Sequence, residues 1–238
     1  MRRDLMLTFV CSVAGCQSTP GAEPHDMSVA AHLAAASGHE AEARHHRDQY
    51  VPDATEARER CLASGTLASQ SVCWTSVRNP TEDQLREAER HHQMAVEHRA
   101  ASQALRDAEA SACAGVSERD RELSPFERRE DISRVAPLRE DFTTAREIRS
   151  HTTGVVVTFR AVPGLTAEWL QRAVNCHLAR NAALGHQVPE MPDCPLVPNG
   201  VSATVRSTGD GFAVALRADD PAALEELQRR AQTLAPDP

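Results

Sequence analysis

The sequence predicts an α+β protein in which an N-terminal antiparallel α-helical hairpin is followed by a small α+β domain, an antiparallel sheet with two helices on one face. Two proline-free stretches, Val29 to Tyr50 and Glu82 to Ala114, are rich in Ala, Glu and Arg, which favour long helices. Farther along, β-branched and alternating segments are separated by glycine-containing turns, which favours an antiparallel sheet. The helical pattern precedes the strand pattern, so hairpin and sheet are expected to form separate units.

Capping patterns mark the ends of the hairpin, which we expect to span residues 28–115. Ser28 suits the N-cap of the first helix, and Pro52 ends that helix. Thr81 opens the second helix and Gly115 closes it. Two long helices joined by a returning connector most simply lie antiparallel.

The connector between the two helices is expected to be helical at first and irregular afterwards. Asp53 followed by Glu56 matches a capping box, which predicts a short helix to about Ser64. The segment that contains Cys73 and Trp74 is predicted to be a loop.

The α+β domain is expected at residues 143–238, after a charged linker at 116–142 that is punctuated by Pro125 and Pro137. Its predicted elements are a strand pair at 146–150 and 155–159 across a turn at 152–154, a helix at 166–184, strands at 201–206 and 212–216 around Gly209-Asp210-Gly211, and a final helix at 220–234. This order is similar to a ferredoxin-like split motif that lacks its last strand.

The first fifteen residues have the organisation of a signal peptide. Arg2 and Arg3 are followed by a mostly apolar run of about eleven residues, too short for the roughly 30 Å of a bilayer. The run ends in Val-Ala-Gly followed by Cys16: an aliphatic residue, two small residues and a cysteine. These four positions resemble the lipobox of bacterial lipoproteins, and the resemblance covers residues 1–16.

The lipobox resemblance implies that residues 1–15 are removed and that Cys16 carries fatty acyl chains, palmitate among them, at the start of a polar tether, residues 16–27. Three acyl chains hold a protein durably on a membrane. Gln17 stands where family members retained in the inner membrane commonly have Asp. The resemblance therefore implies the outer membrane, facing the periplasm or the cell surface. The alternative is an ordinary secretory signal in which Cys16 is a plain cysteine.

Composition excludes several functions. The formal net charge is −8 and no basic stripe is present, so nucleic acid is not an expected partner. Every basic side chain is Arg, which excludes Schiff-base lysine chemistry and a P-loop. Motifs of nucleophilic, phosphate-binding or dinucleotide-binding enzymes are absent. The sequence therefore predicts no enzyme and no obligatory cofactor, but a binding module for another envelope protein or a cell-wall component.

The cysteines predict disulfides, because an exported protein folds under oxidising conditions. Beyond the signal and Cys16, five remain: Cys61, Cys73, Cys113, Cys176 and Cys194. Short loops favour the pairs Cys61–Cys73 and Cys176–Cys194. Cys113 is then either buried and inert or an alternative partner for Cys61 or Cys73.

Eleven histidines suggest a metal site that would make this a transition-metal-binding or buffering lipoprotein. Several recur every seven residues on the two long helices, and two Glu-x-x-His patterns offer carboxylate–imidazole pairs of the kind used in metal-binding bundles. The candidate ligands for Zn or Cu are His39, Glu42, His45, His46, Glu89, His91, His92 and His98. The alternatives are solvated or structural histidines and a pH-responsive seam, since imidazole titrates near pH 6.5.

A second cluster of soft ligands lies in the C-terminal domain. Its members are Cys176, His177, His186, Met191 and Cys194. With reduced thiols it would suit copper or zinc, whereas oxidation would join its cysteines in a disulfide.

Overall fold

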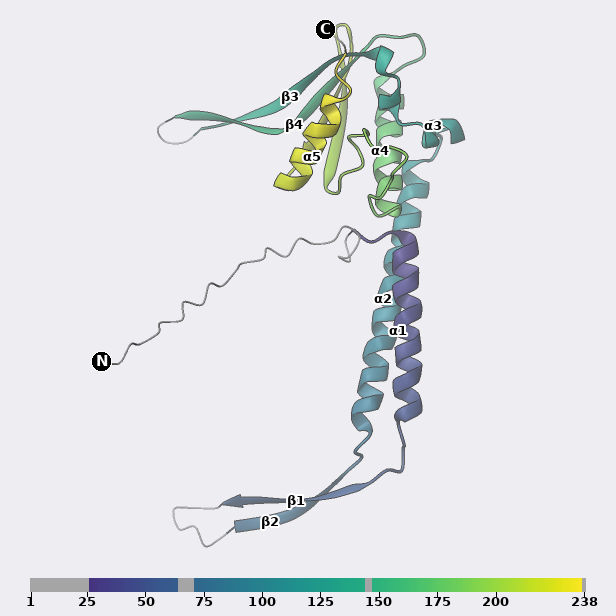
Figure 1. The fold of residues 1–238 in the computed structure, drawn as a ribbon, viewed down its shortest axis with the longest axis vertical. Coiled ribbons are helices and arrows are strands. Elements are labelled where there is room, and N and C mark those ends of the chain that lie inside the picture. Colours follow the sequence, from purple (N-terminus) through teal and green to yellow (C-terminus); the bar gives the residue numbers. More distant parts are fainter. Residues whose placement is uncertain (1–25, 64–70, 144–146, 237–238) are drawn as a thin grey trace, which may run out of the picture.

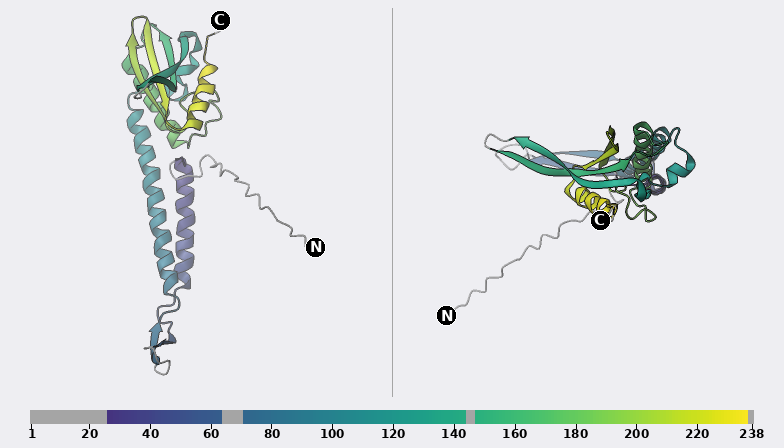
Figure 2. Two further views of the ribbon diagram at one scale, coloured as in Figure 1. Left: turned by 90° about the vertical axis from the view of Figure 1, so that its left-hand side faces the viewer. Right: turned by 90° about the horizontal axis from the view of Figure 1, so that it is seen from above.

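The computed structural model of the chain describes residues 26–63, 71–143 and 147–236. It shows the predicted α+β architecture (Figure 1). Helices α1 (Val29–Gln49) and α2 (Glu82–Ala112) run side by side, with a two-stranded ribbon at one end and the α+β domain at the other. The left view in Figure 2 shows the same elongated arrangement. The predicted signal peptide and lipidation site lie outside the described residues.

The hairpin packs through small side chains that recur every seven residues. Ala36 and Ala43 of α1 and Ala88, Ala95 and Ser102 of α2 are all buried. A repeat of seven keeps one face of each helix towards its partner, as in a coiled coil. Small residues at these positions allow the two helices to approach closely.

The connector is a β-ribbon, so the predicted helix from Asp53 to Ser64 and the predicted loop around Cys73 are both wrong. Strands β1 (Glu56–Ala63) and β2 (Ser71–Arg78) pair antiparallel, with Cys61 opposite Cys73. The helix-favouring composition of β1 was outweighed by cross-strand pairing with a partner rich in β-branched and aromatic residues. Local propensity is a weak determinant when such a partner is present.

The segment predicted as a linker, 116–142, is part of the folded domain. It contains α3 (Glu118–Glu122), two 3₁₀ turns (η1, Pro125–Glu127; η2, Arg129–Asp131) and most of strand β3 (Ile132–Thr143). Phe126 and Ile132 are buried in the core. Pro125 occupies the first turn of a 3₁₀ helix and Pro137 lies in an edge strand, two positions that tolerate proline.

The four-stranded antiparallel sheet has the order β3-β4-β6-β5, with β5 at Val201–Thr208 and β6 at Gly211–Ala218. Strand β4 runs unbroken from Ile148 to Arg160, so the predicted turn at 152–154 is wrong. Gly154 does not turn the chain there. A Cβ at this position would lie 1.8 Å from the Leu216 carbonyl oxygen, so glycine is needed for close strand pairing.

Two helices cover one face of this sheet, as predicted. Helix α4 (Ala167–Ala183) connects β4 to β5, and β6 inserts between those two strands, which forms a split β-α-β unit. Helix α5 (Pro221–Gln232) contacts the sheet, and its buried residues belong to the same core as those of α4. The fully buried side chains of this core include Val157, Leu170, Val174, Val214, Leu216 and Leu227.

In the part of the chain that the structure describes, no helix is both long and apolar enough to cross a membrane.

Candidate functional site

Five histidines meet along the interface of the helical hairpin, and we call this row the histidine seam. His32, His39 and His46 project from α1, and His91 and His98 project from α2. Each helix alternates histidine with a small residue at steps of three and four, which places both residue types on the inner face. The seam therefore follows from the same repeat that packs the hairpin.

The imidazoles of the seam pair across the interface through their Nδ1 atoms. The Nδ1 atoms of His32 and His98 are 2.9 Å apart, and those of His39 and His91 are 3.1 Å apart. In each pair one Nδ1–H donates and the other Nδ1 accepts, and the tautomer of each ring decides which one is the donor. His46 ends the row by donating from Nδ1 to the Gln84 side-chain oxygen at 2.6 Å.

Ring stacking links these pairs into one continuous row. The His39 ring stacks on His98 with centroids 5.5 Å apart and an interplanar angle of 16°. The His46 ring stacks on His91 at 5.5 Å and 12°. Histidines of α1 and α2 thus alternate from one end of the seam to the other.

Solvent reaches most of the seam, and an acidic side chain flanks it. His32 is 3% exposed, whereas His39 and His91 are half-buried. A hydrogen bond from Arg90 lowers the pKa of Glu87, and positive charge on His46 and His91 would lower it further. The seam therefore offers imidazole nitrogens with a carboxylate close by.

The structure brings together half of the predicted metal ligands. His39, His46, His91 and His98 lie in the seam, while Glu42, His45, Glu89 and His92 are exposed outside it. The Glu-x-x-His pattern therefore picked out the wrong faces of the helices. His32 belongs to the seam and Gln84 borders its end, and both were missed as site residues. The seven-residue spacing that His32 shares with His39 and His46 would have identified it.

No three candidate ligand atoms of the seam converge within 4.8 Å of one another. In the described part of the chain the only such group is Glu59 with Cys61 and Cys73, whose sulfur atoms are bonded to each other. As folded, the seam offers pairs of ligands.

One of the two predicted disulfides is confirmed and the other is wrong. Cys61 bonds Cys73 as expected, but Cys176 bonds Cys113 and leaves Cys194 as a buried free thiol. The end of α2 packs against α4, where Cys113, Val116 and Cys176 form a small buried cluster. Tertiary packing therefore brought together cysteines that are 63 residues apart in sequence.

The predicted sulfur–imidazole cluster of the C-terminal domain does not converge. Cys176 is oxidised, and the His177 ring is buried with Nε2–H donating to the backbone carbonyls of Asp120 and Leu123. Burial lowers the pKa of His177, so the ring is held neutral. His186 instead donates from Nδ1 to the Val197 carbonyl. These histidines therefore support the fold of the domain.

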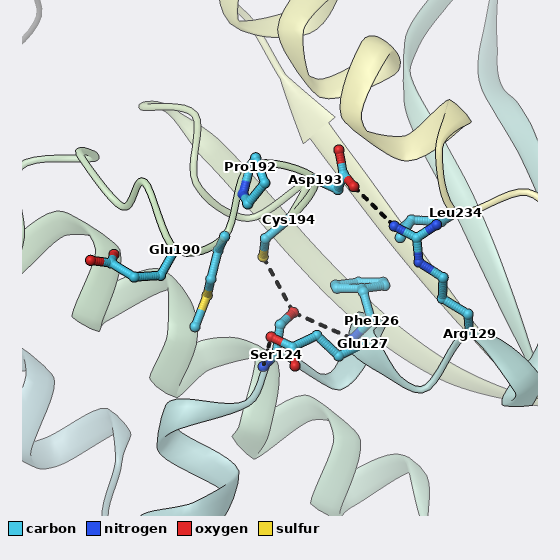
Figure 3. Close-up of a pocket in the computed structure, with 10 residues that line it drawn as sticks. Ser124, Phe126, Glu127, Arg129, Glu190, Pro192, Asp193, Cys194 and Leu234 are labelled. Carbon is cyan, nitrogen blue, oxygen red and sulfur yellow. Dashed lines mark hydrogen bonds and ion pairs between the residues drawn. The ribbon is translucent and has the colours of Figure 1, made fainter.

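A cavity of about 140 Å³ opens beside Cys194 (Figure 3). The Cys194 sulfur lies 3.3 Å from the Ser124 hydroxyl, and an ion pair of Arg129 with Asp193 closes one side. Burial raises the pKa of the Cys194 thiol, which disfavours the nucleophilic thiolate. Among the described residues that line the cavity there is no histidine to accept the thiol proton. The cavity therefore lacks an activated nucleophile.

Comparison of the chain with protein-family models, with curated proteins and with solved structures found no match.

Proposed function

We propose that this protein is a lipid-anchored lipoprotein of the bacterial envelope that acts as a non-catalytic binding module, with the β1–β2 ribbon as its contact surface. The observation that carries the proposal is the exposure of this ribbon. Residues 56–61 of β1 are exposed, and so are most described positions of β2. Trp74 is 43% exposed and Val77 67%. An isolated two-stranded ribbon is marginally stable because it has no hydrophobic core of its own. The Cys61–Cys73 bond stabilises the pairing of the two strands.

One face of the ribbon combines aromatic and basic side chains. Strand alternation and register place Arg58, Arg60, Trp74 and Ser76 on the same face, with Arg60 directly opposite Trp74. Trp and Arg are the residue types that contribute most to binding at protein interfaces. This face therefore suits an envelope protein with an acidic surface, with Trp74 as the apolar anchor.

The start of α1 and the ribbon lie at opposite ends of the hairpin (Figure 1). Helix α1 begins beside the α+β domain and ends at the ribbon (Figure 1). Its 21 residues span about 30 Å at 1.5 Å per residue. Acyl chains at Cys16, upstream of α1, would hold the domain near the membrane and leave the ribbon free to reach a partner.

Photo-crosslinking in intact cells tests the contact surface. We expect a crosslinker at Ser76 to capture a protein that the same crosslinker at Val96, exposed on the hairpin, does not. The purified partner should then bind at least tenfold more weakly to Trp74→Ala and to Arg60→Ala. Equal capture from both positions, or capture of cell-wall glycan alone, would overturn the assignment of a protein partner.

Intact-mass analysis of the membrane fraction tests the anchor. We expect the chain to begin at Cys16 with acyl chains attached, and Cys16→Ser to move the protein to the soluble fraction. A soluble wild-type protein with an unmodified Cys16 would rule out the lipid anchor.

A further inference from the structure

We propose that the histidine seam is a divalent transition-metal site, in which His39 of α1 and His91 of α2 chelate Zn²⁺, Cu²⁺ or Ni²⁺ and join the two helices. This site goes beyond the binding role of the ribbon, from which it is separate. Imidazole nitrogens suit these three ions, and two facing helices supply them here.

The spacing of the paired nitrogens is close to that of a metal chelate. In tetrahedral zinc sites the Zn–N bonds are 2.0–2.1 Å, which places two nitrogens about 3.3 Å apart. The Nδ1 atoms of His39 and His91 are 3.1 Å apart. For both neutral rings to ligate through Nδ1, the donor ring exchanges its Nδ1 proton with solvent and takes one up at Nε2. The two Nδ1 lone pairs then turn towards the ion, and the nitrogens move apart by only ~0.2 Å.

The His39–His91 pair is favoured over the His32–His98 pair by its access to solvent and to further ligands. His32 is 3% exposed, so little room is left for water molecules to fill the remaining coordination positions of a metal ion. His39 and His91 are half-buried, and Glu87 lies one helical turn before His91 on α2. Water would fill the remaining coordination positions, and the Glu87 carboxylate would join them only by leaving its ion pair with Arg90. This set differs from the exposed Glu-x-x-His pairs that the sequence suggested.

The consequence of binding is a metal-dependent stabilisation of the hairpin. An ion held by one residue from each helix binds the folded hairpin and not the separated helices. Binding of this kind stabilises the folded state by mass action, by about 2.7 kcal/mol when free metal is 100 times the Kd.

Calorimetric titration tests the site. The full-length protein, purified in detergent without a polyhistidine tag, is titrated with ZnCl₂, NiCl₂ or CuSO₄. We expect a Kd below about 10 μM for at least one ion. His91→Ala should weaken binding at least tenfold. The matched control is His45→Ala with His92→Ala, two exposed histidines outside the seam, and should leave Kd unchanged within twofold.

A second variant separates loss of a ligand from loss of the fold. His39→Gln keeps a side chain that can pair with imidazole, as Gln84 pairs with His46, but removes the metal-binding nitrogen. We expect its helical circular dichroism to match the wild type while its metal affinity falls at least tenfold. Cys194→Ser should bind as the wild type does, which excludes the buried thiol as the ligand.

Nitrogen-15 spectra of the imidazoles give a readout that does not depend on affinity. We expect zinc to move the Nδ1 resonances of His39 and His91 and to leave those of His45 and His92 in place. The proposal is overturned if no ion binds more tightly than about 10 μM, if His39→Gln binds like the wild type, or if the control variant loses binding. A seam that only exchanges protons would give the first of these results.

Discussion

Removing the Cys113–Cys176 bond should be the most damaging disulfide change in this protein. The two cysteines are 63 residues apart, and the loop-entropy relation gives a loss of about 4 kcal/mol in the free energy of unfolding for a loop of that length. Both cysteines are buried where α2 meets α4, so replacement by alanine also leaves a small cavity.

The Cys61–Cys73 bond provides a matched comparison. Its 12-residue separation gives about 3 kcal/mol by the same relation. The ribbon, however, is exposed and can unfold locally while the rest of the molecule stays folded. We therefore expect Cys61→Ala with Cys73→Ala to leave the main unfolding transition almost unchanged.

Equilibrium unfolding in urea, followed by circular dichroism at 222 nm, measures both effects. With a slope of about 2 kcal/mol per molar urea, Cys113→Ala with Cys176→Ala should lower the midpoint by about 2 M. A decrease below about 0.5 M would refute the loop-entropy reasoning. Peptide mapping without reduction checks the pairing itself, because a Cys176–Cys194 peptide would contradict the packing of α4 against α2.

Four further substitutions test the fold. Burial lowers the folded-state pKa of His177 below the ordinary value of about 6.5. The neutral ring therefore contributes its full stabilisation above pH 6.5, and this stabilisation is lost as the pH falls below 6.5. His177→Gln should flatten this part of a curve of stability against pH. Gly154→Ala should lower the free energy of unfolding by about 1–3 kcal/mol, because a Cβ there meets the Leu216 carbonyl. Gly38→Ala has open space in mid-helix and should raise the free energy of unfolding by up to about 1 kcal/mol. Thermal unfolding compares the two variants. Hydrogen bonds from two neighbouring arginines lower the pKa of Glu226 to about 2, yet Glu226→Gln should cost less than about 1 kcal/mol in urea titrations because the pair is solvent-screened.

Local patterns predicted the elements that local interactions form. The four helices α1, α2, α4 and α5 were predicted, and so was the β5–β6 hairpin. Capping residues and hydrophobic periodicity identify these elements because they act within a few residues of the chain. The ribbon was mispredicted because β1 has helix-favouring residues and becomes a strand only through its partner β2. The segment 116–142 was mispredicted because Phe126 and Ile132 reveal their role only when a core is present to bury them.

The candidate site was half predictable for a similar reason. The seven-residue spacing placed His39, His46, His91 and His98 among the candidates, since that spacing is a property of each helix alone. Which of the many histidines face the other helix depends on the rotation of α1 relative to α2. That rotation is decided by the small residues at Ala36, Ala43, Ala88 and Ala95, which must meet for the hairpin to close.

The sequence by itself determined an α+β protein, its helical hairpin, the two helices and the last strand hairpin of its C-terminal domain, and the histidine repeat. Each of these rests on residue type and short-range spacing. Only the tertiary structure decided that Cys113 bonds Cys176, that the connector is a ribbon and that five imidazoles form one row. The physical reason is that these features join segments far apart in the chain, and burial and close packing choose among pairings that local sequence leaves equivalent.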